Sequence, residues 1–411
     1  MDVVFSRCSG LDVHKATVVA NTRIRHDDGR LEVVKQSFGT TTNELLRLAD
    51  WLSKHGVTHI AMESTGVYWK PVYNILHGSF DVWVVNARHL AQVPGRKTDE
   101  NDAAWIAKLM SYGLLERSFI PPVAQRDLRD LTRYRTQLLQ AKSRTANRLH
   151  KVLEDANIKL TSVASDIQGV SARLMLEALI ADEQSPEEMA QLAQKRMRNK
   201  IPQLVEALTG RVRAHHRFLL QELLTQLDRQ NECIVTLNQR IVELTQPYAS
   251  IIQRLDEVTG IGQRTAEIVL AEIGPSVENW SSDAKLAAWA CLCPGNHESA
   301  GKRKSGKRRK GQKWLVTALV EAAWAASRSK DTYLGAQFHR LRARRGAKRA
   351  AVAVAHSILV IVYHLLKDPT ASYQDLGGDY FLKQNKEQEQ RRALKTLRSL
   401  GYKVVLTPVA A

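Results

Sequence analysis

Strand patterns are confined to the first 85 residues of this chain of 411, and this division constrains the fold more than any other feature. Residues 5–20, 22–38, 57–64 and 80–85 have β-branched, alternating or continuous apolar content. Residues 42–55 and 67–77 have helical spacing, and Gly56 marks the end of the first of these helices. From about residue 123 to residue 247 the strand signals vanish. The sequence therefore predicts a mixed sheet with helices packed on it, followed by a helical region.

The helical region contains a heptad pattern between residues 220 and 244. Its apolar positions recur at alternating spacings of three and four, and Gln230 is the polar exception. This pattern is typical of a coiled-coil seam, with Gln230 setting the register. An amphipathic helix packed within its own chain gives the same pattern, so both interpretations stay open.

Four acids in the first quarter of the chain are the strongest chemical signal. Asp12 lies inside a predicted strand, Glu63 ends another, and Asp99 and Asp102 begin a predicted helix one turn apart. Singly, each suits a structural role, as a helix cap, a turn residue or a solvated strand end. Aspartate is nevertheless disfavoured inside a strand, so Asp12 needs a reason. Together the acids predict a site for Mg²⁺, which prefers oxygen ligands and activates both oxygens of a phosphodiester displacement when two ions are bound.

A nearby acidic pair competes with this interpretation. Asp27 and Asp28 precede Gly29 between two strand-like runs, which predicts a hairpin turn and not a second metal site.

The overall charge indicates a polyanionic partner. The chain has 60 Lys and Arg against 42 Asp and Glu, a formal net charge of +18 and an isoelectric point of about 9.8. Such an excess is expected of a nucleic-acid-binding protein, although membrane-surface and ribosomal proteins share it. A basic run, which we expect to form a loop between an apolar segment and a helix, supplies the expected phosphate contacts. It comprises Lys302, Arg303, Lys304, Lys307, Arg308, Arg309, Lys310 and Lys313.

Two further elements of the last third could contact phosphate. Gly260-Ile261-Gly262 between two apolar helices resembles a helix-hairpin-helix, whose backbone amides would face a phosphate beside Arg264. A plain helical hairpin is the alternative. Ser299, next to the basic run, could act as a nucleophile stabilised by the cations, and Ser305 has similar neighbours. A second basic stretch, residues 340–349, lies on a helical pattern and could follow a phosphate backbone.

The remaining composition points to the cytoplasm. The few cysteines, Cys8, Cys233, Cys291 and Cys293, indicate reduced core residues and no zinc site. No run of about 18 apolar residues is apparent and the N-terminus lacks a signal-peptide layout, so no membrane partner is expected.

Several separated motifs resemble one known family. GLDVHK, AMESTGVYW, GRKTDENDAAWIAKL, LRDLTRYR, the glycine hairpin and PGNHESAGKRKSGK occur in the order found in DEDD-type transposases of bacterial insertion sequences, the insertion-sequence one-ten (IS110) family. The resemblance covers about residues 5–365. It implies that Asp12, Glu63, Asp99 and Asp102 bind Mg²⁺, for which Mn²⁺ can substitute. It implies further that Ser299 is the nucleophile, with Ser305 in reserve because Ala300 separates Ser299 from Gly301.

The resemblance also implies a fold, partners and an activity. The expected fold is α/β plus all-α: a RuvC-like (ribonuclease-H fold) catalytic domain at residues 1–122, a helical or coiled-coil region at 123–247, a transposase domain at 248–368 and a peripheral tail at 369–411. The expected partners are donor and target DNA, a structured bridge RNA that guides them, and further copies of the chain in a dimer or tetramer. The expected activity is cutting and rejoining DNA. The alternatives are a Holliday-junction resolvase or structure-specific nuclease without serine chemistry, and a non-catalytic nucleic-acid-binding protein.

Overall fold

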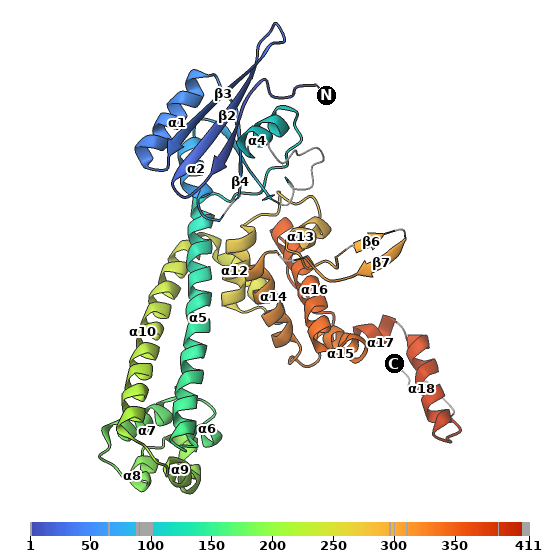
Figure 1. Cartoon of the computed structure of the whole chain (residues 1–411). Coiled ribbons are helices and arrows are strands. Elements are labelled where there is room, and N and C mark those ends of the chain that lie inside the picture. The colour runs from blue at the N-terminus through green and yellow to red at the C-terminus, as the bar shows by residue number, and fades with distance from the viewer. Residues whose placement is uncertain are drawn as a thin grey trace. The chain divides into compact units, whose positions relative to one another are not determined.

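The computed structural model describes residues 2–64, 66–87, 90, 102–295, 297–299, 301–309, 311–384 and 386–404. The chain divides into two compact units, residues 1–120 and residues 121–411. Figure 1 shows the sheet of the first unit and the helices of the second.

The first unit is a five-stranded mixed sheet with helices packed on it. Its elements are β1 (Arg7–Val13), β2 (Thr17–Arg25), β3 (Leu31–Gly39), α1 (Thr42–Lys54), β4 (His59–Glu63), α2 (Trp69–Leu76), β5 (Asp81–Val85) and α4 (Asp102–Ser111). The strand order is β3-β2-β1-β4-β5, antiparallel through β3, β2 and β1 and parallel through β1, β4 and β5. This architecture is consistent with the ribonuclease-H-like fold that the order of strands predicted. The predicted turn before Gly29 is also confirmed: Gly29 has a φ of +82° in the β2–β3 connection.

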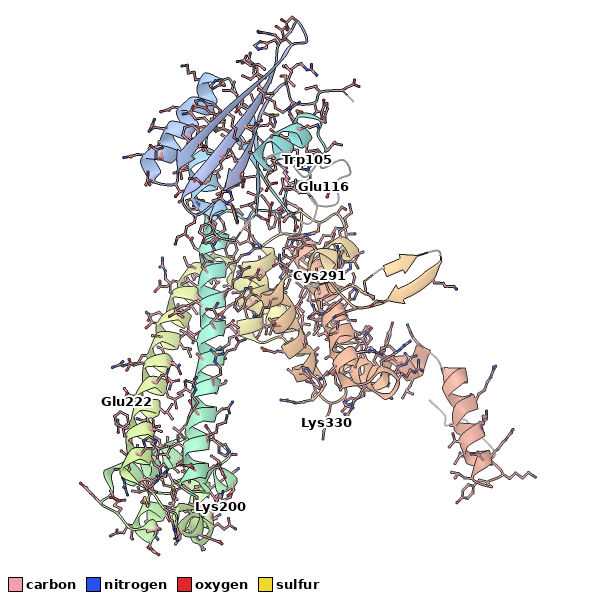
Figure 2. The ribbon with its side chains drawn as sticks, in the orientation of Figure 1. Trp105, Glu116, Lys200, Glu222, Cys291 and Lys330 are labelled. Atoms are coloured by element: carbon pink, nitrogen blue, oxygen red, sulfur yellow. The ribbon has the colours of Figure 1, made fainter. Side chains whose placement is uncertain are left out.

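Alternation along the strands divides the sheet into two faces. One face carries Leu11 and Met62, which are buried in the cluster formed with the apolar sides of α1 and α2. The opposite face carries Cys8 and Ala61, which are buried under α4. Trp105, labelled in Figure 2, belongs to the second cluster and is only 5% exposed.

The second unit is almost entirely helical. Its elements are α5 (Val123–Asp155), α6 (Leu160–Val163), α7 (Val170–Ala181), α8 (Pro186–Gln191), the 3₁₀ helix η1 (Lys195–Lys200), α9 (Ile201–Leu208), α10 (Ala214–Thr245), the 3₁₀ helix η2 (Gln246–Tyr248), α11 (Ala249–Asp256), α12 (Gln263–Ile273), α13 (Asp283–Trp289), β6 (His297–Ser299), β7 (Lys302–Ser305), α14 (Lys313–Ala326), α15 (Tyr333–Arg345), α16 (Ala347–Lys367), α17 (Tyr380–Gln384) and α18 (Lys386–Ser399).

The heptad pattern of α10 is used within the chain. The long helices α5 and α10 lie side by side (Figure 1). Leu220 and Leu227 are buried in a cluster with Leu149 of α5, and Gln230 donates to the hydroxyl of Thr145 across the two helices at 3.4 Å. The intrachain interpretation of the pattern therefore accounts for the buried seam positions.

Two expectations need correction. The sequence was expected to lack an apolar run long enough to cross a membrane, but α16 is long and apolar enough by length and composition. Slightly over half of that window is buried, and Ile358 and Leu359 are core residues, so core packing accounts for its apolar character. The basic run was expected to be a loop, but its first part pairs as strand β7 with β6.

Candidate functional site

Asp12 and Glu63 lie at the ends of two neighbouring parallel strands. Leu11 of β1 is in register with Met62 of β4, and each acid is the next residue along its strand. Since side chains alternate, both acids point to the face opposite Leu11 and Met62. Both are half-buried, and the side chain of Asp12 is 24% exposed. Parallel pairing thus brings two carboxylates to one edge of the sheet.

Gly10 allows α4 to lie directly on β1. A Cβ atom at this position would be 2.2 Å from the carbonyl oxygen of Ala103 and 2.4 Å from the amide nitrogen of Ala107. Two residues earlier, the thiol of Cys8 donates to the carbonyl oxygen of Ala107 at 3.5 Å. Helix α4 therefore runs antiparallel to β1, and its first residue, Asp102, lies toward the Asp12 end of the strand. Burial under the helix raises the pKa of Cys8 to about 12.

Three of the four predicted acids therefore reach the same end of the sheet on the same face. Asp102 is exposed in the first turn of α4, where the helix dipole favours an acid. Asp99 lies outside the described residues. Within the part of the chain that the structure describes, no three His, Cys, Asp or Glu side chains lie close enough to hold a metal ion.

His14 is a neighbour that the search for acids missed. Its Nε2 atom lies 3.2 Å from Oδ2 of Asp12, and its side chain is 63% exposed. The only signal in the sequence is a histidine two residues beyond the strand aspartate. A solvent-exposed imidazole in contact with this carboxylate can orient it or exchange a proton with it.

Ser299 lies on a short antiparallel hairpin of the second unit. In the ladder of β6 and β7 it is opposite Lys302, and Gly301 turns the chain with a φ of +71°. The structure describes the backbone of Ser299 but not its side chain. The hydroxyl of Ser305 accepts from the amide of Lys307 at 3.1 Å, so it already serves a local turn.

The basic run continues from this hairpin into the start of α14. Its exposed members are Lys302, Lys307, Arg308, Arg309 and Lys313. The side chains of Arg303 and Lys304, and all of Lys310, lie outside what the structure describes. Exposed cations on a short hairpin and its connection to α14 can contact a phosphate backbone without reading its sequence.

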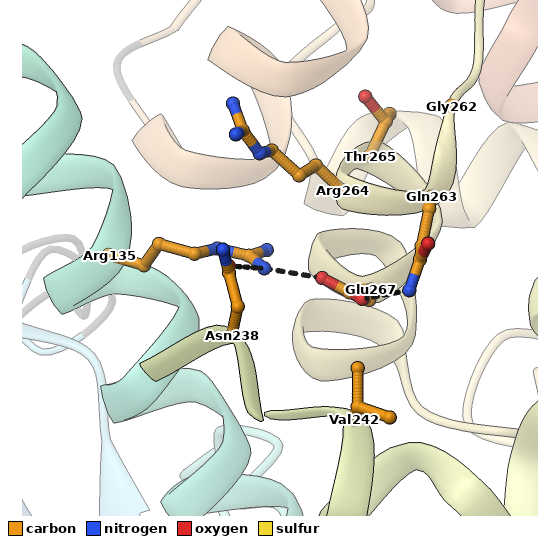
Figure 3. Close-up of a pocket in the computed structure, with 8 residues that line it drawn as sticks. All are labelled: Arg135, Asn238, Val242, Gly262, Gln263, Arg264, Thr265 and Glu267. Atoms are coloured by element: carbon orange, nitrogen blue, oxygen red, sulfur yellow. Dashed lines mark hydrogen bonds and ion pairs between the residues drawn. The ribbon is translucent and has the colours of Figure 1, made fainter. Parts of the chain in front are cut away.

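The glycine hairpin is a tight turn between α11 and α12. Gly260 has a φ of +92°, and a Cβ atom there would be 2.3 Å from the carbonyl oxygen of Ala322 in α14. Gly262 is the N-cap of α12, with no side chain capping the helix and no acid in the first turn. Arg264 is exposed on this first turn and lines a hollow of about 490 Å³ (Figure 3).

Buried ion pairs fix α12 to α5. Arg135 of α5 donates to Glu267 at 2.5 Å and to Asn238 at 3.1 Å. Arg133 donates through two nitrogens to Glu272, at 2.7 and 2.8 Å. Each carboxylate is almost fully buried, so its charge would destabilise the fold without the arginine that pairs with it.

Comparison with known families gives two matches along the chain. The DEDD transposase model of the IS110 family matches residues 9–158, and the model described as "Transposase IS116/IS110/IS902 family" matches residues 252–340. Together these matches cover more than half of the chain, in the expected order. The chain belongs to the IS110 family of transposases.

The two family matches fall on the elements described above. The first begins within β1 and covers the rest of the sheet and α5, and the second runs from within α11 to within α15 and includes the β6–β7 hairpin. A curated relative, the "Putative transposase y4pF/y4sB" of Sinorhizobium fredii, is 29% identical over 185 residues. That alignment covers 42% of this chain and 47% of the relative, so the chain spans about half the length of the relative it matches.

Proposed function

We propose that this IS110-family protein is a Mg²⁺-dependent DNA transposase that cuts and rejoins the strands of a mobile element. The observation that carries the proposal is that Asp12, Glu63 and Asp102 lie at the same end of the sheet on one face, a placement of Asp102 that depends on the close approach of α4 to Gly10. An acid inside a strand and two further acids at the same end of the sheet, in a protein of net charge +18, are better explained by a cation that they bind than by three separate structural roles.

The residues present suit Mg²⁺ in their chemistry. Asp12, Glu63 and Asp102 offer oxygen ligands on partly or fully exposed side chains, and Asp99 is proposed as the fourth. When bound, Mg²⁺ or Mn²⁺ supplies Lewis-acid activation of a phosphodiester. The role of the chain is to hold these oxygens in place, with His14 in contact with Asp12.

Ser299 is the proposed nucleophile. Its Oγ would attack the scissile phosphorus, forming a serine–phosphate bond while the bond to one bridging oxygen breaks. The serine proton passes to a base or water, and the departing strand end takes up a proton as a free hydroxyl. A hydroxyl of another strand then reverses these steps on the phosphoserine, which joins the two strands. Exposed Lys302 and its neighbours would stabilise the charge that develops on the phosphate.

The family resemblance supports the remaining proposals. A structured bridge RNA would pair with donor and target DNA, so that base pairing supplies sequence and the protein contacts backbone and shape. The glycine hairpin would act as a helix-hairpin-helix. Copies of the chain would assemble as dimers or tetramers, acting on nucleoid DNA in the cytoplasm. Because α5 covers the heptad positions of α10, we place that assembly on other surfaces.

A recombination assay tests the proposal. The gene with its flanking DNA, which would encode the guide RNA, is supplied with a target plasmid, and covalent protein–DNA adducts are trapped by denaturation. We expect Ser299→Ala to abolish the adduct and Ser305→Ala, the matched hydroxyl on the same hairpin, to retain it. An adduct that persists in Ser299→Ala rejects the serine assignment. Metal-dependent cleavage without any adduct would favour the resolvase-like alternative.

A further inference from the structure

Two adjoining hollows meet at the first turn of α12. One, of about 490 Å³, is lined by Asn238 and Glu267, and the other, of about 450 Å³, is lined by Lys142 and Trp314 among others. Arg135, Arg264 and Thr265 line both. The two hollows therefore share two guanidinium groups and a hydroxyl as a common wall, and together they are called the groove; Figure 3 shows the lining of the first hollow.

Arg135 has a donor that its known partners leave unused. Its side chain is only 2% exposed, and Nη1 is engaged by Glu267 and Asn238. Among the described residues, Nη2 is one of the few buried side-chain nitrogens without a hydrogen-bond partner. A buried N–H group without a partner is destabilising, so native proteins rarely leave one unless a ligand or water completes it.

The first turn of α12 offers further donors toward the same groove. Its N-cap, Gly262, provides no side-chain acceptor, and no acid lies in the first turn to neutralise the positive end of the helix dipole. Arg264 is exposed there, and no carboxylate in the described part of the chain pairs with it. The helix is 11 residues long, so its dipole is well developed.

We infer that this groove is a binding subsite for one phosphodiester of a nucleic-acid backbone, held between Nη2 of Arg135 and the guanidinium of Arg264. The inference rests on the proposed function and adds a specific contact to it. Glu267 holds Arg135 in place and neutralises part of its charge, so the subsite suits a singly charged phosphodiester. Phosphate contacts of this kind position a nucleic acid and do not read its sequence.

Thr265→Glu is the sharpest test. An acid in the first turn favours the helix dipole, so the thermal midpoint should be unchanged or higher. The same carboxylate would repel the phosphate and compete for both arginines, so affinity should fall about ten-fold. Arg135→Lys keeps a cation for Glu267 but has no second nitrogen to donate to the phosphate. We expect it to lower the affinity for nucleic acid about five-fold. Arg240→Gln, which removes an exposed arginine paired with Glu243 on α10, is the charge-matched control.

Binding of the full chain is measured in EDTA by fluorescence anisotropy, with random-sequence duplex DNA and a hairpin RNA as separate probes. The association constant K is measured at several salt concentrations, and the slope of log K against log salt is compared between variants. Relative to Arg240→Gln, Thr265→Glu should make this slope shallower by about 0.7–0.9, which is the value of one phosphate contact. A loss confined to one probe identifies DNA or RNA as the source of the phosphate. If Thr265→Glu binds both probes as the control does, the subsite is wrong. If the wild-type chain binds neither probe, the proposed function fails instead.

Discussion

Replacing Gly10 with alanine should disturb both the stability and the metal site of the first unit. The new Cβ would be 2.2 Å from the carbonyl oxygen of Ala103, and real Cβ atoms essentially never come closer than 3.0 Å to such a neighbour. Helix α4 must therefore shift by at least 0.8 Å, which is the difference between these distances. Overpacking of this size typically costs about 1–3 kcal/mol of the free energy of unfolding.

Cys8 reports whether α4 has moved. Its pKa is raised from 9.0 to about 12 by burial, so at pH 8 its reactive thiolate is reduced about 1000-fold relative to an ordinary thiol. If alkylation requires local opening of α4, a destabilisation of about 1–3 kcal/mol speeds it by roughly 5- to 150-fold. Peptide mass spectrometry separates this site from the other cysteines. The same shift moves Asp102, and a misplacement of about 1 Å can lower Mg²⁺-dependent cleavage by about 100-fold.

Gly29→Ala is the matched control. It places the same methyl group in the β2–β3 turn, where no described atom beyond the chain neighbours lies within 4 Å but φ is +82°. Its cost should be about 1–2 kcal/mol of backbone strain, and alkylation of Cys8 should not become faster because the β2–β3 turn does not pack under α4. A Gly10→Ala protein with wild-type melting and wild-type alkylation would refute the packing argument. A protein that is destabilised and alkylated faster but cleaves normally would remove Asp102 from the proposed site.

The other predictions use different properties of the chain. Asp12→Asn should abolish Mg²⁺-dependent plasmid cleavage while the thermal midpoint stays nearly constant, because the side chain is partly exposed; retained cleavage contradicts the metal assignment. Leu227→Asp combined with Ile234→Asp should lower the thermal midpoint steeply, since both side chains are buried within the chain. Light scattering should show an unchanged mass of the assembly. A smaller assembly with normal stability would instead place the heptad seam between subunits. The backbone hydrogen bond from Gly39 lowers the pKa of Glu44. Glu44→Gln should therefore have a lower free energy of unfolding than wild type above about pH 4.3, and this difference should vanish as pH falls through the lowered folded-state pKa. A difference in unfolding free energy that does not change with pH contradicts this prediction.

Much of the first unit could be predicted from local patterns. The alternation around Leu11 and the helical spacing of Leu45, Leu48 and Leu52 depend only on period, and each residue is buried where the period places it. The acids could be located because aspartate inside an apolar strand conflicts with its propensity. Gly10 could not be interpreted in this way. Its role arises from Ala103 and Ala107, which are about a hundred residues away in sequence and leave no local signal.

The features of the second unit that could not be predicted have a similar origin. A heptad pattern specifies an apolar face but not the identity of the helix that covers it, so α5 could not be chosen over a second subunit. The basic run was expected to be a loop because charge hides strand periodicity, yet Lys302 to Ser305 pairs through backbone groups that any residue supplies. The apolar length of α16 likewise reflects burial by its neighbours.

The ion pairs between α5 and α12 connect the fold to the proposed phosphate subsite. Arg129 and Arg133 lie against the buried carboxylate of Glu272, and burial of Arg129 lowers its pKa to about 10 although the charge of Glu272 opposes that shift. Well-packed apolar side chains would usually stabilise such a contact as well or better, so stability alone is a weak reason for these charges. Their directional hydrogen bonds fix the rotation and register of α12 on α5. That geometry sets where the first turn of α12, with Arg264, stands relative to Arg135. We therefore expect replacement of Arg129, Arg133 and Glu272 together by methionine, which leaves no buried charge without a partner, to preserve the thermal midpoint while weakening nucleic-acid binding. Equal binding by this variant would separate the ion pairs from the subsite.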